Sequence, residues 1–430
     1  MLIIHNPKLL DLIKSSYCME DLLSIINTLD RQGTFQFPTL ETGLFSAAIT
    51  SSETSYTGYY RAWVRDNIHI AHAQYVIGQT DIASGTAIAL MKYFTRYRDR
   101  FDQIIAQPDL ANEIMNRPHI RFDGNTLSEI DQHWSHAQND ALGYFLWFYC
   151  KLVNEGHLEL IIDELEILLL FPRYFQAIQY WQDEDHGHWE EKEKVQASSI
   201  GTVVAGLREL QLMNVRIEEL TGADNEFNFS LWTDLIRQGE AALTEILPYE
   251  CRQPEAQQRR TDSALLFLIY PLGVVDHTMA DQIIGDVTEQ LQGEIGIRRY
   301  LMDSFWAPDY KTNLTPDKRT MGIDQEEKRD SLAQAGKEAQ WCIFDPILST
   351  IFGHRYHISG DEAHLQQQTL YLNRALGQLT GPDCPLGEYK CPELYYLEQG
   401  QYIANDATPL LWSQANLRIG LHTMVESLSR

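Results

Sequence analysis

The chain has 430 residues, of which 44% are hydrophobic and 11% aromatic, and this content excludes a wholly disordered polypeptide. Its 60 acidic and 34 basic residues give a formal charge of −26, which repels phosphate backbones and anionic lipid surfaces. We therefore expect neither a nucleic-acid partner nor a membrane partner, whereas a neutral ligand is indifferent to this charge.

The amino terminus and the cysteines favour a reducing, cytoplasmic location. Residues 1–16 lack the basic segment and the small-residue cleavage site of a signal peptide. The longest apolar runs, such as residues 141–150, are much shorter than a membrane span. The six cysteines show no CxxC spacing, although Cys384 and Cys391 are close enough in sequence to pair under oxidising conditions. We expect no cofactor and no bound metal, and the oligomeric state is left unassigned.

Apolar residues at three- and four-residue spacing predict a mainly α fold. The expected helices span residues 17–30, 65–78, 80–106, 131–154, 157–181, 197–213, 228–246, 262–270, 277–292, 338–357, 361–379 and 407–427. Short turns join some of these helices to the next, whereas long polar connections that contain aromatic residues precede others. This alternation predicts six helical hairpins, which can close into an (α/α)6 barrel with the long loops at one end. Functional side chains are then expected on those loops.

We expect residues 1–430 to form a single domain. The most polar connection, residues 307–336, is predicted to be a loop over the mouth of the barrel, because both of its flanks are helical and similar in composition. A boundary between two domains at this connection is the alternative.

The first candidate site residues precede the second predicted helix. Residues 59–67 place several aromatic side chains next to Arg65 and Asp66. Asp66 has two open interpretations. It is an N-cap of the helix, or it joins Arg65 in presenting donors and acceptors in fixed directions to the hydroxyl groups of a sugar.

The next long connection contains Trp134 among amides, carboxylates and histidines at residues 131–140. Trp134 is either a core anchor or a platform for the apolar face of a pyranose ring. The histidines in this segment are expected to form hydrogen bonds rather than to bind a metal.

Two adjacent glutamates, Glu190 and Glu191, follow a tryptophan and precede a helix of small residues. They are either a solvated loop end or partly buried, and burial would raise a carboxyl pKa so that one group stays protonated near neutral pH. The nearby His186 and His188 lack further ligands for a metal site.

Glu393 lies between a proline and two tyrosines in the last long connection. Alone it is consistent with an exposed glutamate in a turn. Glycoside hydrolysis, however, needs two carboxyl groups, one acid and one base or nucleophile, and Glu190 offers the partner.

Eight motifs in this order resemble those of the glucoamylase-type glycoside hydrolases, family 15, and of their relatives, the alpha and beta subunits of phosphorylase kinase. They are AWVRDN at 62–67, WSHAQNDA at 134–141, HWEE at 188–191, ASSIG at 197–201, GIRRY at 296–300, EAQW at 338–341, PELYY at 392–396 and LLWSQA at 410–415. Each motif is weak alone, but their order and spacing are jointly specific. The resemblance extends over roughly residues 35 to 425.

This resemblance implies an (α/α)6 barrel and inverting hydrolysis, with Glu190 as the general acid and Glu393 as the base that activates water. It implies a pocket for the terminal glucose of a neutral α-linked oligosaccharide or polysaccharide, cleaved from the non-reducing end. The residues it places in or near that pocket are Tyr59, Trp63, Arg65, Asp66, Trp134, Glu191, Arg299, Trp341 and Trp412, with Arg298 as an alternative to Arg299. A non-catalytic or regulatory glucan-binding module, as in the kinase subunits, is the alternative function.

Overall fold

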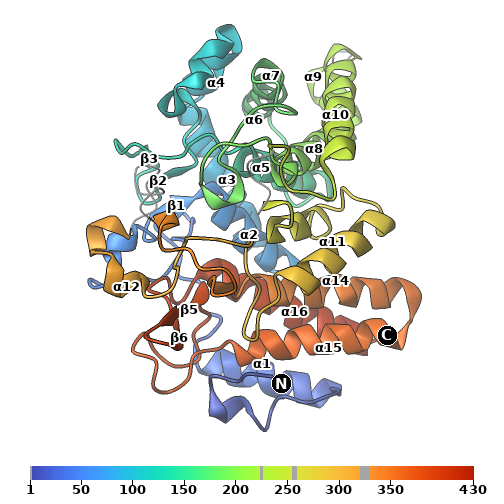
Figure 1. The fold of residues 1–430 in the computed structure, drawn as a ribbon. Coiled ribbons are helices and arrows are strands. Elements are labelled where there is room, and N and C mark those ends of the chain that lie inside the picture. The colour runs from blue at the N-terminus through green and yellow to red at the C-terminus, as the bar shows by residue number, and fades with distance from the viewer. Residues whose placement is uncertain (1, 223–225, 254–258, 320–328) are drawn as a thin grey trace.

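The computed structural model describes residues 2–222, 226–253, 259–319 and 329–430 (Figure 1). Within these ranges the secondary structure is mainly helical, and β structure is limited to two three-stranded sheets. The prediction of an all-α fold is confirmed.

Six elements contact one another in a closed ring, which corresponds to the inner layer of an (α/α)6 barrel. In ring order they are α2 (Val64–Val76), α5 (Asn139–Asn154), α8 (Ala197–Leu212), η7 (Ser263–Leu268), α14 (Phe344–Ser359) and α16 (Leu411–Leu428), which returns to α2. Nearly all residues of α5 are buried, as expected of a helix that packs on every side. The 3-10 helix η7 takes the place of one α-helix, which corrects the prediction of an α-helix at 262–270.

A second set of helices packs against the ring (Figure 1). The principal pairs are α3 (Thr80–Arg96) with α2, α10 (Glu226–Ile246) with α8, α11 (His277–Gln290) with η7, α15 (Glu362–Gly377) with α14, and α1 (Met19–Arg31) with α16. Smaller helices are α4 (Asp99–Ala106), α6 (Ile162–Leu168), α7 (Leu170–Ala177), α9 (Asn214–Thr221) and α12 (Tyr310–Asn313). Further 3-10 turns are η1 (Pro7–Leu9), η2 (Ser55–Thr57), η3 (Pro108–Asn112), η4 (Ile114–Asn116), η5 (Gly187–Trp189) and η8 (Pro316–Lys318).

Both small sheets lie where chain segments enter inner helices. One contains β1 (Ala62–Trp63), β2 (Arg121–Asp123) and β3 (Ser128–Glu129), and the other contains β4 (Gln340–Trp341), β5 (Leu394–Glu398) and β6 (Gln401–Ala404), all antiparallel. Because β1 leads directly into α2 and β4 closely precedes α14, the sheets fix the long connections at the N-terminal ends of the inner helices.

Several predicted helix boundaries are wrong where the backbone bonds to a distant segment. The helix expected at 131–154 begins only at Asn139, because Ala137 O accepts a hydrogen bond from His186 N. The helix expected at 338–357 begins at Phe344, because Gln340 and Trp341 pair with β5. The expected helices at 80–106 and 157–181 are each divided in two, and α9 was not predicted.

Part of the predicted loop at 307–336, residues 320–328, lies outside the described residues. The described part contains α12 and η8 and contacts the hairpin of β5 and β6: Asp309 N donates to Leu397 O, and Lys311 forms an ion pair with Asp406. Its position over the barrel mouth and the single-domain organisation stay predictions.

In the described ranges, no helix combines the length and the apolar character needed to cross a bilayer. All six cysteines are free thiols, so Cys384 and Cys391 are not paired.

Helices α5 and α8 approach each other closely at Gly143. A Cβ atom at this position would lie 2.6 Å from the carbonyl carbon of Thr202 and 2.7 Å from the nitrogen of Val203. We expect Gly143→Ala to separate the helices and to lower the free energy of unfolding by about 1–3 kcal/mol in urea denaturation. Gly85→Ala in α3 is the control, because a Cβ there meets nothing within 4 Å. It should be neutral or stabilise by about 0.5–1 kcal/mol. Equal losses in both variants would contradict the close approach.

Candidate active site

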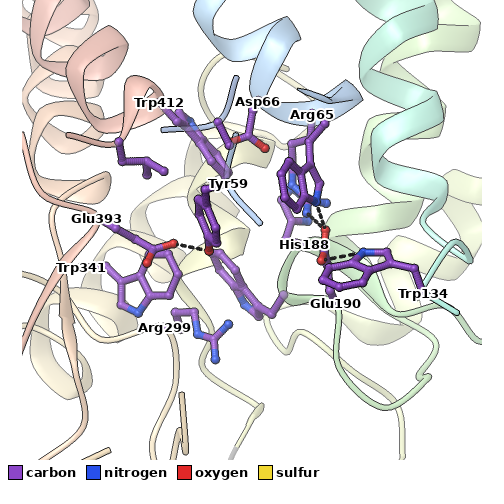
Figure 2. A pocket seen from close by; sticks show the side chains of 14 residues that line it. Tyr59, Arg65, Asp66, Trp134, His188, Glu190, Arg299, Trp341, Glu393 and Trp412 are labelled. Carbon is purple, nitrogen blue, oxygen red and sulfur yellow. Dashed lines mark hydrogen bonds and ion pairs between the residues drawn. The ribbon is translucent and has the colours of Figure 1, made fainter. Parts of the chain in front are cut away.

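One pocket brings together the predicted site residues from distant parts of the chain. Its wall consists of Ala47, Tyr59, Trp63, Arg65, Asp66, Trp134, His188, Trp189, Glu190, Arg299, Trp341, Glu393, Leu410 and Trp412 (Figure 2). Every predicted site residue except Glu191 is in this set. The residues come from the connections at the N-terminal ends of inner helices, or from the first turns of those helices, as the barrel prediction requires.

Glu190 is held by three donors on one side of the pocket. The indole nitrogen of Trp63 donates to Oε1 at 2.9 Å, that of Trp134 donates to Oε2 at 3.1 Å, and Arg65 Nη2 lies 3.3 Å from Oε1. The backbone of Glu190 is left-handed, with φ of 58°. Burial raises the pKa of its carboxyl above the usual value, although the charge of Arg65 opposes this shift. Glu190 therefore keeps a proton more readily than an exposed glutamate does.

Arg65 is fixed by partners outside the pocket wall. Its Nη1 donates to Gln138 Oε1 at 3.0 Å and to Asp140 Oδ2 at 2.6 Å. These bonds place the guanidinium beside Glu190, and both Arg65 and Asp140 are buried. Arg65 Nε has no hydrogen-bond acceptor among the described residues.

Glu393 has a different set of donors. The hydroxyl of Tyr59 donates to its Oε1 at 2.7 Å, and Asn405 Nδ2 donates to its Oε2. Burial raises the pKa of Glu393 to about 7, while the hydrogen bonds from Tyr59 and Asn405 act in the opposite direction. In Figure 2 the carboxyl groups of Glu190 and Glu393 lie on opposite sides of the pocket.

Asp66 is not the N-cap of α2. Trp63 occupies that position, and Asp66 is the third residue of the helix, in the pocket wall. Its side chain is buried, which raises its pKa to about 7; the positive charge of Arg65 lowers this pKa and the carboxylate of Glu190 raises it. The N-cap interpretation is therefore wrong, and sugar binding by Asp66 stays a prediction.

Glu191 lies behind the wall, where it holds Arg299. Its Oε1 accepts from Arg299 Nη2 at 2.7 Å, and its Oε2 accepts from the Tyr300 hydroxyl at 2.7 Å. Burial alone would raise the pKa of Glu191, but the charges of Arg299 and Arg259 lower it to about 2. Glu191 is thus an anion that positions Arg299.

The structure distinguishes the two arginines of the GIRRY motif. Arg299 lies in the pocket wall and also bonds to Asp303, whereas Arg298 forms an ion pair with Glu338 at 3.0 Å. Of these two, Arg299 therefore faces the pocket.

Trp341 and Trp412 supply donors as well as apolar surface. Both side chains are buried in the wall, and the described residues offer no acceptor for either indole N–H. A buried donor without a partner is costly, so these groups suit a ligand rich in hydroxyl oxygens.

The histidines of the site form hydrogen bonds. His136 Nδ1 accepts from Ile120 N at 3.4 Å, and His188 Nε2 is 3.1 Å from the hydroxyl of Tyr144. Across the described ranges, no group of three His, Cys, Asp or Glu side chains is arranged to hold a metal ion.

Sequence reasoning missed Asn405, Gln138 and Asp140 as parts of the site. Asn405 follows β6, twelve residues after Glu393, and reaches it only because the β5–β6 hairpin reverses the chain. Asn405 and Asp406 lie directly before the helix predicted at 407–427, and nothing else in the local sequence marks them. Gln138 and Asp140 were noted as unusually polar, and their partner, Arg65, is more than seventy residues away.

Comparisons with known proteins identify the family and the fold of the chain. Residues 26–337 match the family described as Glycosyl hydrolases family 15. A relative from Caenorhabditis elegans, "Probable phosphorylase b kinase regulatory subunit alpha", is 25% identical over 399 residues, which is 86% of this chain. The match covers 31% of that relative, so the chain spans about a third of its length.

Solved structures show the same fold at low identity. A "Glycosidase Wild Type" structure has a TM-score of 0.66 and 18% identity, and the match covers 94% of this chain and 96% of that one. The glucoamylase from Saccharomycopsis fibuligera has a TM-score of 0.61 and 14% identity, over 96% of this chain and 99% of that one.

Proposed function

The chain belongs to glycosyl hydrolase family 15, and from this premise we propose that it is an inverting exo-hydrolase that releases glucose from the non-reducing ends of α-linked oligosaccharides or polysaccharides. The observation that carries the proposal is the pair of buried carboxyl groups, Glu190 and Glu393, on opposite sides of one aromatic pocket (Figure 2). Each has its own donors, so the two groups titrate in different environments.

In the proposed reaction Glu190 donates its proton to the glycosidic oxygen as the bond from that oxygen to the anomeric carbon breaks. Glu393 accepts a proton from a water molecule whose oxygen attacks the opposite face of the same carbon. One water is consumed, and the configuration at the anomeric carbon inverts. Asp66, Arg299 and the free indole N–H groups would bind the hydroxyl groups of the terminal sugar.

A panel of substrates tests this function directly. Purified protein is incubated with maltose, maltoheptaose, isomaltose and trehalose, and the products are separated by chain length. We expect glucose and maltohexaose in equal amounts as the early products from maltoheptaose, because a pocket that binds one chain end releases one sugar per turnover. Early products of intermediate length, from maltose to maltopentaose, would contradict exo cleavage, and the relative rates on the panel report the linkage.

The anomeric form of the first glucose tests inversion. An inverting enzyme acting on an α-glucoside must release β-glucose, which proton NMR detects before mutarotation mixes the anomers. If α-glucose appears first, Glu393 does not act as a base through water, since that outcome requires a retaining mechanism.

Replacing Asp66 with asparagine should weaken substrate binding and lower kcat together, by about 10–100-fold in kcat/KM, because contacts to the terminal sugar position it for attack. The pKa of Asp66 is about 7. Asparagine resembles the protonated acid, so the deficit should grow as the pH rises above about 7 and the native group ionises. Asp81→Asn, in the first turn of α3 and exposed, is the control. Normal kinetics in both variants would contradict a binding role.

A regulatory glucan-binding module is the second candidate, and the name of the kinase-subunit relative favours it. A binder would show saturable affinity for maltooligosaccharides without glucose release in the panel above. The cytoplasmic location stays a prediction.

A further inference from the structure

A second cavity of about 500 Å³ lies beside the β5–β6 hairpin, and none of its lining residues belongs to the first pocket. This volume lies within the range of about 300–1,000 Å³ typical of small-molecule sites. Its wall joins the amino-terminal segment, the connection at 380–386 and the hairpin. These segments are far apart in the chain and are brought together by the fold.

The polar groups of this cavity favour a ligand with hydroxyl donors. Glu53 and Asp383 are exposed, and the described residues give their carboxylates no partner. The single lysine, Lys311, is neutralised by Asp406 at 2.7 Å. The wall therefore has a surplus of anionic acceptors, which disfavours phosphates and other anions.

The apolar groups of the cavity favour a ligand with an apolar face. Tyr402 is half-buried in the wall, and Pro7, Pro382 and Pro385 line it with carbon surface. A saccharide combines hydroxyl edges with an apolar ring face, which matches such a mixture. Since no three metal-ligating side chains are grouped in the described part of the chain, a divalent cation fits less well.

We propose that this cavity is a second binding site for a neutral oligosaccharide, and that its occupancy acts on Glu393. Ala404 and Asp406 line the cavity, and the residue between them, Asn405, donates to Glu393 Oε2. Asp406 is further tied to Tyr56 and Lys311. A ligand that shifts Asp406 therefore shifts Asn405, and with it the carboxylate of Glu393. The action on Glu393 rests on the proposed function, whereas the binding does not.

Binding is tested by titration calorimetry with maltotriose in a Glu190→Gln background, so that turnover does not consume the ligand. We expect two binding sites for maltotriose per chain in this background. One site should remain after Tyr402→Ala or Glu53→Gln is added, and these two residues belong to different segments of the cavity wall. Tyr249→Ala, which removes an exposed tyrosine elsewhere, should keep both sites. Unchanged stoichiometry in the cavity variants would overturn the proposal. So would Tyr402-dependent binding of spermidine in place of maltotriose, which would identify a site for organic cations.

Coupling is tested by the steady-state kinetics of maltotriose hydrolysis. We expect the initial rates of the native protein and of Tyr249→Ala at high maltotriose concentration to differ by about fivefold or more from the hyperbola fitted at low concentration, as is typical of coupled sites. Tyr402→Ala should be hyperbolic. Hyperbolic kinetics in the native protein would overturn the action on Glu393. If the protein hydrolyses nothing, the proposed function fails, and the calorimetry still decides whether the second site exists.

Discussion

Glu190→Gln and Glu393→Gln are each expected to lower kcat for maltose by about 10²–10⁴-fold, the usual contribution of a general acid or base. Substrate affinity should change little, because both changes act on the chemical step. At position 393 the hydrogen bonds survive: the amide oxygen still accepts from Asn405, and the Tyr59 hydroxyl can rotate to accept from the amide nitrogen. At position 190 the amide nitrogen leaves at least one donor without its acceptor: the Trp134 indole if the nitrogen replaces Oε2, or both the Trp63 indole and the Arg65 guanidinium if it replaces Oε1.

The leaving group separates the two roles. With α-glucosyl fluoride, whose fluoride departs without a proton, Glu190→Gln should recover much of its rate, whereas Glu393→Gln should remain slow because water must still be activated. Glu166→Gln, an exposed glutamate beside Arg98, is the control and should behave as the native protein. If both active-site variants recover equally on the fluoride, Glu393 is not the base.

Asn405→Ala is expected to move the acid limb of the kcat/KM profile to higher pH and to lower kcat/KM by about 10–100-fold near pH 6. The rate of the native protein should rise as the pH passes the Glu393 pKa of about 7, because a base works only when ionised. The hydrogen bond from Asn405 favours the ionised form, so its loss raises this pKa. At a pH below the pKa, a rise of the pKa by one lowers the ionised fraction of Glu393 about tenfold. The deficit should shrink as the pH rises.

Asn154→Ala provides a matched control, since Asn154 also donates to a glutamate, Glu209 Oε2 at 2.8 Å, away from the pocket. Tyr59→Phe should shift the limb in the same direction as Asn405→Ala, because it removes the other donor to Glu393. A deficit that is equal at every pH would show that Asn405 acts only on stability or on binding.

The fold was predicted best where apolar periodicity is set by local contacts. The helix α8 was expected at 197–213 and lies at Ala197–Leu212. Prediction failed where the partner of the backbone is remote. Ala137 O accepts a hydrogen bond from His186 N, and α5 begins only after it; β4 pairs with β5 and with Ile297, both far away in the chain. The segment 262–270 was given as an α-helix because the periods of 3-10 and α-helices are nearly indistinguishable over one or two turns.

The site followed the same rule. Most residues of the pocket wall were predicted from motifs in which several members are adjacent, such as Trp63, Arg65 and Asp66, whereas Ala47, His188, Trp189 and Leu410 were not. Glu191 lies behind the wall because it accepts a hydrogen bond from Arg299, which is 108 residues away in the chain. Sequence spacing could not indicate this contact. Asn405 was missed for the same reason, since nothing in its own neighbourhood indicates the carboxylate that it contacts.

The short segment from Tyr59 to Arg65 touches both carboxyl groups. Tyr59 bonds to Glu393 across 334 residues, and Trp63 bonds to Glu190 across 127 residues. This segment therefore contributes to the spacing between the acid and the base. Its contacts with both carboxyl groups form only when the carboxyl-terminal part of the chain has docked onto the amino-terminal part. Such long-range closures form slowly. A ribosome-bound or truncated chain that ends before residue 393 can have most of its helices and still lack a working site, so activity during refolding should report the last contacts to form, not the first.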